Sequence, residues 1–297
     1  MNRNRKLYLQ MFAAETGATL TTDLEPAISV DFVSRISTNI RQLQELLGIV
    51  DLIPMSAGTD IKIYKWTVGT LGTQVPEGET INPTNVKRKL SQTITLDLDK
   101  YRRVTTAEAI QKVGRNIAIN QSDEHLVREV QKSIKNSLYT VLKAGTGTAT
   151  GASLQIVLAN LWSKLQTYYE DMDVSPVYFI NPQDVADYLG TAQVTMQTAF
   201  GFTYIENFLG LGIAIVSPQV EAKKPIATAK ENLRGAYVPM SGDVAQTFNL
   251  IADTTGLAGM THDAKTGNAT VDTLLMSCVK FFPEFSDGVF IGTISGE

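Results

Sequence analysis

The fold is decided by residues 60–103, which begin with DIKIYKWTV at 60–68 and contain TITLDLDK at 93–100. Apolar and polar side chains alternate in both stretches, and a period of two is typical of β-strands. The segment between them, residues 71–91, is polar and carries two glycines and two prolines, which favour turns. The pattern predicts a long β-hairpin with a wide tip over residues 60–103.

The predicted hairpin is long for the protein that carries it. A ribbon of this length reaches roughly 60 Å at about 3.3 Å per residue in each arm, whereas a compact chain of 297 residues has a radius of gyration of about 19 Å. A two-stranded ribbon alone is only marginally stable in water. We therefore expect the hairpin to lie on another subunit. The alternative is that its strands fold back into an ordinary meander.

The composition excludes several classes of protein. The chain is 43% hydrophobic and 19% charged, which excludes disordered and coiled-coil proteins. No apolar run approaches the roughly 18 residues that a membrane span needs. The N-terminus, MNRNRKLYLQMFAAE, lacks the apolar stretch of a secretory signal. We expect a globular protein that does not cross a membrane.

Side chains that could carry chemistry are few. One cysteine, Cys278, cannot form an internal disulfide, and we expect it to be a small buried hydrophobic residue. The two histidines, His125 and His262, provide no zinc spacing, and His125 is expected to be exposed. Residues 145–153 are glycine-rich but lack the lysine of a phosphate-binding loop. We therefore expect no catalytic, metal or cofactor site, although a Ser–His–Asp arrangement remains arithmetically possible.

Two long helices are predicted in the N-terminal half. Residues 1–29 have no durable period and are expected to form an extended arm. Apolar residues recur three or four apart over 31–47, which predicts a helix that Gly48 ends. A second helix is expected to begin at Ser122 as N-cap, with Asp123 and Glu124 in its first turn favoured by the helix dipole. Its apolar residues recur every four positions at Leu126, Val130, Ile134, Leu138 and Leu142.

Short helices and strands alternate in the C-terminal half, beyond an expected interdomain linker at residues 145–153. Asn181 and Pro182 suit the N-cap and first position of a short helix. A stretch rich in glycine and threonine, residues 253–269, precedes two terminal strands. The other elements expected are a helix over 154–169, strands over 177–181, 210–218 and 235–240, and the terminal strands within 270–284 and 287–294.

Charge is unevenly distributed along the chain. Residues 60–103 carry eight basic and five acidic side chains, and residues 104–145 carry six and four. Residues 146–297 carry seven basic and fifteen acidic side chains. The basic middle of one copy would attract the acidic C-terminal half of a neighbouring copy. The alternative is that these charges are scattered over the surface and solvated. No compact basic patch with interleaved aromatic residues occurs, so sequence-specific nucleic-acid binding is not expected.

The order of these elements resembles that of the HK97-fold major capsid proteins of tailed bacteriophages. The matching stretches are KIYKWTV…ITLDLDKYRRV, DEHLVREVQKSIKNSLYTVLKAG, VYFINPQDVADYLG…GLGIAIVSP and TVDTLLMSCVKFFPEFSDGVFIGTISGE. The resemblance covers residues 20–297. It implies an α+β chain with an N-terminal arm, a long E-loop hairpin, a peripheral domain with a spine helix, and an axial α/β domain.

The resemblance also implies domain boundaries. They are an N-terminal arm with a short helix at 1–59, the E-loop hairpin at 60–103, the peripheral domain with its spine helix at 104–145, the axial domain at 146–252, and terminal strands returning through both domains at 253–297.

A family member of this kind is a structural protein of the virion, assembled in the host cytoplasm. The resemblance implies hexamers and pentamers in an icosahedral shell around double-stranded DNA. A portal and a separate scaffolding protein are the expected partners, because residues 1–29 leave no room for a scaffolding extension.

One branch of the family joins its subunits by Lys–Asn isopeptide bonds. That chemistry needs an E-loop lysine, an asparagine on the opposing domain and a glutamate in an apolar setting that accepts the proton. The hairpin has lysines, and Asn268 precedes a terminal strand. That strand, residues 270–279, has no glutamate and only Asp272. We therefore expect noncovalent contacts through the E-loop and the arm.

The basic hairpin is expected to face acidic surfaces of neighbouring copies. Its aromatic residues are candidate anchors, because aromatic side chains carry a large share of interface energy. The candidate intersubunit contacts are Tyr64, Trp66, Lys87, Arg88, Lys89, Tyr101, Arg102 and Arg103.

Two other functions remain open. An encapsulin-like nanocompartment shell would share the fold, but encapsulins hold their cargo on an N-terminal helix, whereas this chain begins with a polar stretch. A soluble α/β enzyme would need a pocket with convergent titratable groups. Asp184 and Asp187 share the first turn of a helix, where capping and the helix dipole explain them better than catalysis does.

Overall fold

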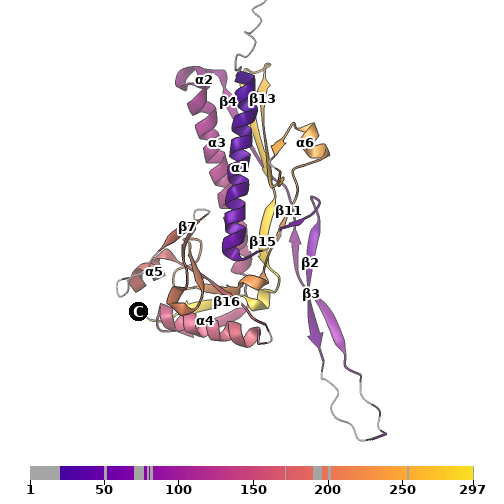
Figure 1. Cartoon of the computed structure of the whole chain (residues 1–297), viewed down its shortest axis with the longest axis vertical. Helices are drawn as coiled ribbons and strands as arrows, with labels where there is room; N and C mark the ends of the chain where they lie inside the picture. Colours follow the sequence, from indigo (N-terminus) through magenta and orange to yellow (C-terminus); the bar gives the residue numbers. More distant parts are fainter. Residues whose placement is uncertain are drawn as a thin grey trace, which may run out of the picture.

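The computed structural model describes residues 21–49, 52–69, 77, 78, 80, 83–170, 172–189, 196–199, 202–252 and 254–296. It is an elongated α+β body from which one β-ribbon projects (Figure 1), as the predicted fold class requires. Two long helices, α1 (Thr21–Leu47) and α3 (Ser122–Leu142), lie side by side along the body. Residues 1–20 of the predicted arm lie outside the described residues.

The shorter elements connect these helices and build the sheets. The other helical segments are α2 (Ala107–Val113), η1 (Asn116–Gln121), α4 (Leu154–Tyr168), α5 (Pro182–Leu189), η2 (Phe208–Gly210), η3 (Lys230–Asn232), α6 (Asp243–Thr247) and η4 (Ser286–Gly288). The strands are β1 (Leu52–Pro54), β2 (Asp60–Val68), β3 (Val86–Thr95), β4 (Asp99–Thr106), β5 (Gly147–Gly151), β6 (Pro176–Ile180), β7 (Gln197–Ala199), β8 (Phe202–Ile205), β9 (Ile213–Val216), β10 (Ile226–Ala229), β11 (Leu233–Tyr237), β12 (Ile251–Ala252), β13 (Ala258–Lys265), β14 (Thr270–Ser277), β15 (Val279–Pro283) and β16 (Phe290–Ile294).

Helix α1 is longer than its apolar pattern predicts. The expectation of an extended arm through residue 29 is wrong for residues 21–29, which are helical. Their sequence, TTDLEPAIS, lacks the apolar stripe that marks the rest of the helix. The predicted end at Gly48 is confirmed, because Gly48 has φ of 70° and its N–H donates to the carbonyl of Glu45.

Helix α3 carries the expected apolar stripe but begins differently. The turn of π-helix η1 runs directly into it, so Ser122 lies within a continuous helix and is not its N-cap. His125 is exposed, as predicted. The buried stripe packs against β14 and β15 and consists of Val127, Val130, Ile134, Leu138 and Leu142.

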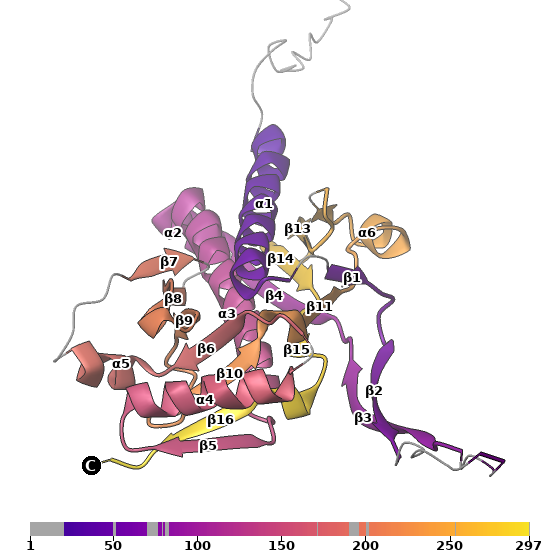
Figure 2. The same cartoon turned by 60° about the horizontal axis from the view of Figure 1, so that its bottom comes forward.

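The largest sheet has seven strands in the order β5-β16-β10-β6-β9-β8-β7. Successive side chains of a strand point to opposite faces, and β6 shows the consequence. Tyr178 and Ile180 pack with α4 on one face, whereas Phe179 on the other meets Tyr139 of α3 edge to face at 5.8 Å. Figure 2 shows α4 lying across this sheet.

Strand β5 corrects a sequence-based prediction. It lies within the supposed linker and pairs in parallel with β16. Its glycines allow close packing, because a Cβ at Gly147 would lie 2.2 Å from the ring of Phe290. The predicted strands and helices from residue 154 to residue 240 are observed within a few residues of their expected bounds.

The C-terminal segment enters three sheets in succession. β14 lies in a four-stranded sheet ordered β12-β13-β14-β4, β15 in a three-stranded sheet ordered β1-β11-β15, and β16 in the seven-stranded sheet. The prediction of two terminal strands is therefore wrong, because the chain changes sheets at Cys278. That residue is fully buried, as expected. Strand β13 occupies part of the stretch rich in glycine and threonine.

The hairpin consists of β2 and β3, which form a sheet of their own among the described residues. The meander alternative is therefore wrong for these two strands. The predicted second strand, residues 93–100, is wrong beyond Thr95: the chain turns at Leu96, which is fully buried, and continues as β4 beside β14. The hairpin ribbon extends away from the body (Figure 1).

Candidate functional site

A β-bulge in the hairpin decides which side chains share a face. Ile63 lies opposite Gln92, but Tyr64 lies opposite Leu90, so Ser91 is the extra residue of the bulge. Without the bulge, regular alternation along β3 would place Leu90 on the same face as Gln92 and the buried Ile63. The bulge instead places Leu90 on the face of Tyr64.

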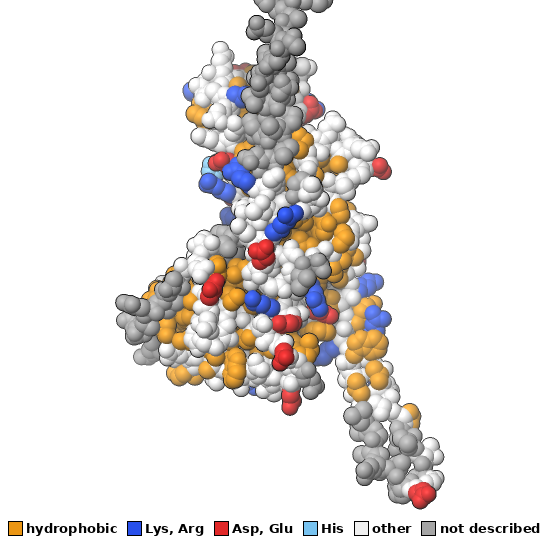
Figure 3. Space-filling view, viewed as in Figure 1, with side chains coloured by type: hydrophobic (Ala, Val, Ile, Leu, Met, Phe, Trp, Pro, Cys, Tyr) orange, Lys and Arg blue, Asp and Glu red, His pale blue; other side chains and the backbone are white. Residues whose placement is uncertain are grey.

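Beyond the bulge, one face of the ribbon is apolar and exposed. Trp66 is 61% exposed, Val68 56%, Val86 53% and Leu90 47%. Figure 3 shows hydrophobic side chains gathered along the projecting ribbon. Single exposed apolar residues are ordinary, but a contiguous stripe of them is typical of an interaction site.

Arg88 lies on this apolar face and stacks on its aromatic residues. The guanidinium carbon is 3.6 Å from the ring centroid of Tyr64 and 5.5 Å from that of Trp66. Cation–π contacts of this kind fix the planes of the rings and of the guanidinium group. The face therefore presents an ordered aromatic surface with one positive charge. We call Tyr64, Trp66, Val68, Val86, Arg88 and Leu90 the apolar face.

The opposite face of the ribbon is basic. Lys65 pairs across the ribbon with Lys89, and Thr67 pairs with Lys87. The Lys65 ammonium forms an ion pair with Asp287 of η4, which belongs to the body. The hydrogen bond and charge of Asp287 raise the pKa of Lys65, and the hydrogen bond from Lys65 lowers the pKa of Asp287. At Lys65 this face is therefore turned toward its own subunit.

The structure divides the predicted contact residues into two groups. Those on the hairpin are Tyr64, Trp66, Lys87, Arg88 and Lys89. Tyr101, Arg102 and Arg103 lie on β4 in the four-stranded sheet, so their placement on the hairpin is wrong.

The three residues of β4 have partners within the subunit. Tyr101 is half-buried against the core and hydrogen-bonds Ser133, and its burial raises the pKa of its phenol. The Arg102 guanidinium lies 2.7 Å from the carboxylate of Asp272. Arg103 belongs to a larger network inside the body.

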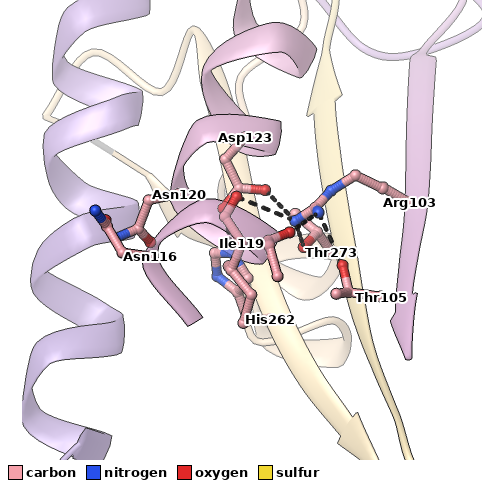
Figure 4. A network of polar contacts seen from close by, with 9 residues as sticks. Arg103, Thr105, Asn116, Ile119, Asn120, Asp123, His262 and Thr273 are labelled. Carbon is pink, nitrogen blue, oxygen red and sulfur yellow. Dashed lines mark hydrogen bonds and ion pairs between the residues drawn. The ribbon is translucent and has the colours of Figure 1, made fainter. Parts of the chain in front are cut away.

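Arg103 ties the start of helix α3 to the sheet (Figure 4). Its Nη1 donates to the carbonyl of Ala118 and to Oγ1 of Thr105, both at 2.8 Å. Its Nη2 donates to Oγ1 of Thr273 at 3.0 Å and to Oδ1 of Asp123 at 2.6 Å. Ala118 belongs to the π-helical turn η1, so one guanidinium joins β4, β14, η1 and α3.

Asp123 is fully buried and has a second partner. Its Oδ2 lies 2.8 Å from Nε2 of His262, whose side chain is also buried. Asp123 lies in the first turn of α3, as predicted, and its carboxylate is in addition held by the side chains of Arg103 and His262. A signal was present in the sequence: Asp123 lies four residues before Val127, on the buried stripe of α3, where a carboxylate requires a charged or hydrogen-bonding partner.

Two cavities among the described residues differ in the side chains that line them. A cavity of about 430 Å³ at the base of the hairpin is lined mainly by apolar residues, including Met55, Leu98 and Met240. Another, of about 460 Å³, contains Asp184, whose carboxylate accepts from the N–H of Lys223 and whose pKa is raised by burial. Among the described residues, no cluster of three or more His, Cys, Asp or Glu side chains could hold a metal ion.

Asn268 lies in the turn between β13 and β14, where its side chain accepts a hydrogen bond from Thr270 at 2.8 Å. Of the helices in the described ranges, none is long and apolar enough to cross a membrane.

The fold resembles those of proteins that form shells. The capsid of an empty GTA particle has a TM-score of 0.57 and 9% identity, with 84% of this chain and 90% of that chain covered. The SrpI encapsulin of Synechococcus elongatus PCC 7942 has a TM-score of 0.54 and 12% identity, with 84% of this chain and 87% of that chain covered. The capsid protein of cyanophage P-SCSP1u has a TM-score of 0.52 and 8% identity, with 83% of this chain and 86% of that chain covered.

The chain has the HK97 fold. Neither a family model nor a curated protein sequence matches it. At 8–12% identity the three similarities are of structure, and they extend over most of each chain. The predicted HK97-like fold is therefore confirmed.

Proposed function

We propose that this protein is the major capsid protein of a tailed bacteriophage. Copies assemble as hexamers and pentamers into an icosahedral shell around double-stranded DNA, in the host cytoplasm, and the shell becomes part of the virion. The observation that carries the proposal is the exposed apolar face of a ribbon that projects from a body with the HK97 fold.

The hairpin acts as the E-loop of this shell. Its apolar face lies on a projecting ribbon, and a ribbon of two strands gains stability by packing on further protein. A neighbouring copy supplies that surface in a lattice where every subunit offers the same contacts. Tyr64, Trp66 and Arg88 are the anchors, and the adjacent lysines meet acidic groups of the neighbour.

The resemblance to HK97-fold major capsid proteins supports an assignment of the rest of the chain. Residues 104–145 form the peripheral domain with α3 as spine helix, residues 146–252 form the axial domain around the capsomer centre, and residues 253–297 link the two. The N-terminal segment of residues 1–59, whose helix α1 packs within the body, adds contacts to neighbours. The contacts are noncovalent, and a separate scaffolding protein and a portal complete the particle.

A nanocompartment shell is the second candidate. The similarity to the SrpI encapsulin, at a TM-score of 0.54, is about as high as that to the GTA particle capsid. The contents of purified particles distinguish the two functions: nuclease-protected double-stranded DNA supports a capsid, and enclosed protein cargo supports a nanocompartment.

Negative-stain microscopy of the purified chain tests assembly directly. We expect shells or capsomers from the native chain, and only small particles from a Trp66→Ser, Leu90→Ser double variant. Trp162→Ser is the matched control, because Trp162 is also an exposed tryptophan, 41% accessible, but lies on α4. A double variant that assembles like the native chain contradicts the role of the apolar face.

Denaturing electrophoresis tests the noncovalent contacts. Boiled particles are expected to release a monomer band. A ladder of covalent multimers that survives boiling contradicts this part of the proposal.

A further inference from the structure

The root of the hairpin is held by a contact that joins distant parts of the chain. Lys65 lies two residues beyond the buried Ile63, where the ribbon leaves the body. Its ammonium group pairs with Asp287, which is 222 residues away in sequence. The other carboxylate oxygen of Asp287 accepts from Oγ1 of Thr146 at 3.1 Å. We call the Lys65–Asp287–Thr146 contact the latch.

The body side of the latch is rigidly built. Asp287 lies in the short turn η4, whose neighbours are hydrogen-bonded to buried polar side chains. Asn232, 2% exposed, donates to the carbonyl of Phe285 and accepts from its N–H. Thr228, fully buried, donates to the carbonyl of Gly288 at 3.0 Å. The carboxylate of Asp287 is therefore a fixed point against which the ribbon is held.

The ribbon side of the latch is more open to solvent. The Lys65 side chain is 53% exposed and that of Asp287 32% exposed. An ion pair in such surroundings is screened by salt and opens readily. Because the bulge at Ser91 places the lysines on one face and the apolar side chains on the other, closing the latch turns the apolar face away from the body.

We propose that the latch fixes the direction of the hairpin on the unassembled subunit and so presents its apolar face to an incoming copy. The consequence for assembly rests on the proposed shell function, whereas the latch itself is a property of the single subunit. A weak contact suits a ribbon that bends by different amounts at different positions of a lattice, because it orients the ribbon without resisting later adjustment.

Distances between spin labels test the latch. Labels are placed on full-length subunits, kept unassembled by dilution, at Asn85→Cys near the hairpin tip and at Ser163→Cys on α4, two exposed positions. The native Cys278 is buried, which raises the pKa of its thiol to about 11 and keeps it from reacting with the label. Asp287→Asn and Lys65→Met open the latch.

The matched control is Lys89→Met, which removes the same charge from the same face, directly opposite Lys65. We expect both latch variants to widen the distance distribution at least about twofold, as an unanchored ribbon samples more directions. The control is expected to keep the native width. In 1 M salt, where the Debye length is about 3 Å, the native chain is expected to approach the variants.

Two results overturn the latch. One is a native distribution in both Asp287→Asn and Lys65→Met with unchanged thermal unfolding, and the other is equal widening in Lys89→Met. Failure of the shell function is a separate outcome, because a native chain that forms no shells still has a measurable hairpin direction. Widening in the latch variants of such a chain supports the latch alone.

Discussion

The Arg103–Asp123 pair in the body and the Lys65–Asp287 pair at the root of the hairpin join the same kinds of charge in opposite surroundings. Asp123 is fully buried and Arg103 has five acceptors around it, including the carbonyl oxygen of Ile119 at 3.4 Å. Lys65 is half exposed. The buried pair therefore holds the body in one arrangement, whereas the exposed pair holds the ribbon by a contact that water and salt weaken.

The comparison has an energetic basis. Breaking a buried ion pair by removing one partner costs about 3–5 kcal/mol, because the other charge is left without compensation in a medium that solvates it poorly. An exposed pair contributes roughly 0–1 kcal/mol, since water solvates each charge once they separate. The two sites should therefore respond very differently to equivalent substitutions.

The largest effect is expected from Asp123→Ala. The substitution leaves the Arg103 guanidinium and His262 without their shared carboxylate, so the free energy of unfolding should fall by about 3–5 kcal/mol in urea titrations. Asp263→Ala is the control, because Asp263 forms an exposed pair with Lys265, and a change within about 0.5 kcal/mol is expected there. A loss below about 1 kcal/mol in Asp123→Ala would remove the contrast between the two sites.

A smaller effect is expected from Thr273→Val. The change keeps the shape of a buried side chain but removes one acceptor of Arg103, which should cost about 1–2 kcal/mol in the same titration. Thr293→Val on β16, where the residue is exposed, controls for the general effect of the substitution in a strand. Equal losses in the two variants would mean that the network tolerates a missing acceptor.

The smallest effect on stability is expected from Asp287→Asn, and it should depend on pH. The pKa of Asp287 is lowered, so its contribution is present above the ordinary carboxyl pKa near 3.8 and is lost as the pH falls through the lower folded value. The pKa of Lys65 is raised, so its contribution is present below 10.5 and is lost as the pH rises through the higher folded value.

The free energy of unfolding of the native chain should therefore exceed that of Asp287→Asn by less than about 1 kcal/mol. This difference should stay constant between roughly pH 5 and pH 9. Urea titrations at pH 3, 5, 7 and 9 measure this difference. A difference that grows steadily across the range from pH 5 to pH 9 would show that other titrating groups govern the hairpin root.

The sequence predicts periodic elements well because burial of one face leaves a repeating pattern. The stripe of α3 and the alternation of β2 are both observed. The alternation of residues 93–100 also continues through Leu96, but a period of two does not say which strand is the partner. At Leu96 the chain leaves the hairpin and joins a different sheet, which depends on tertiary packing. For this reason the sequence pattern assigns Tyr101, Arg102 and Arg103 to the hairpin, whereas they lie on β4.

Other features escape prediction because their packing demands residues that look like loop or surface residues. Strand β5 is built from small residues, since a larger side chain at Gly147 would collide with Phe290. The first-turn position of Asp123 predicts only a favourable dipole interaction, whereas its position on the buried stripe also requires a partner. The bulge at Ser91 depends on how two strands align, which neither strand encodes by itself.

The succession of β14, β15 and β16 through three sheets has a consequence for synthesis of the chain. Arg103 pairs with Thr273, Gly235 with Phe281, and Gly147 with Phe290. Each of these sheets stays incomplete until residues 270–294 have left the ribosome. Nascent chains therefore cannot complete the body of the subunit before this segment has been translated.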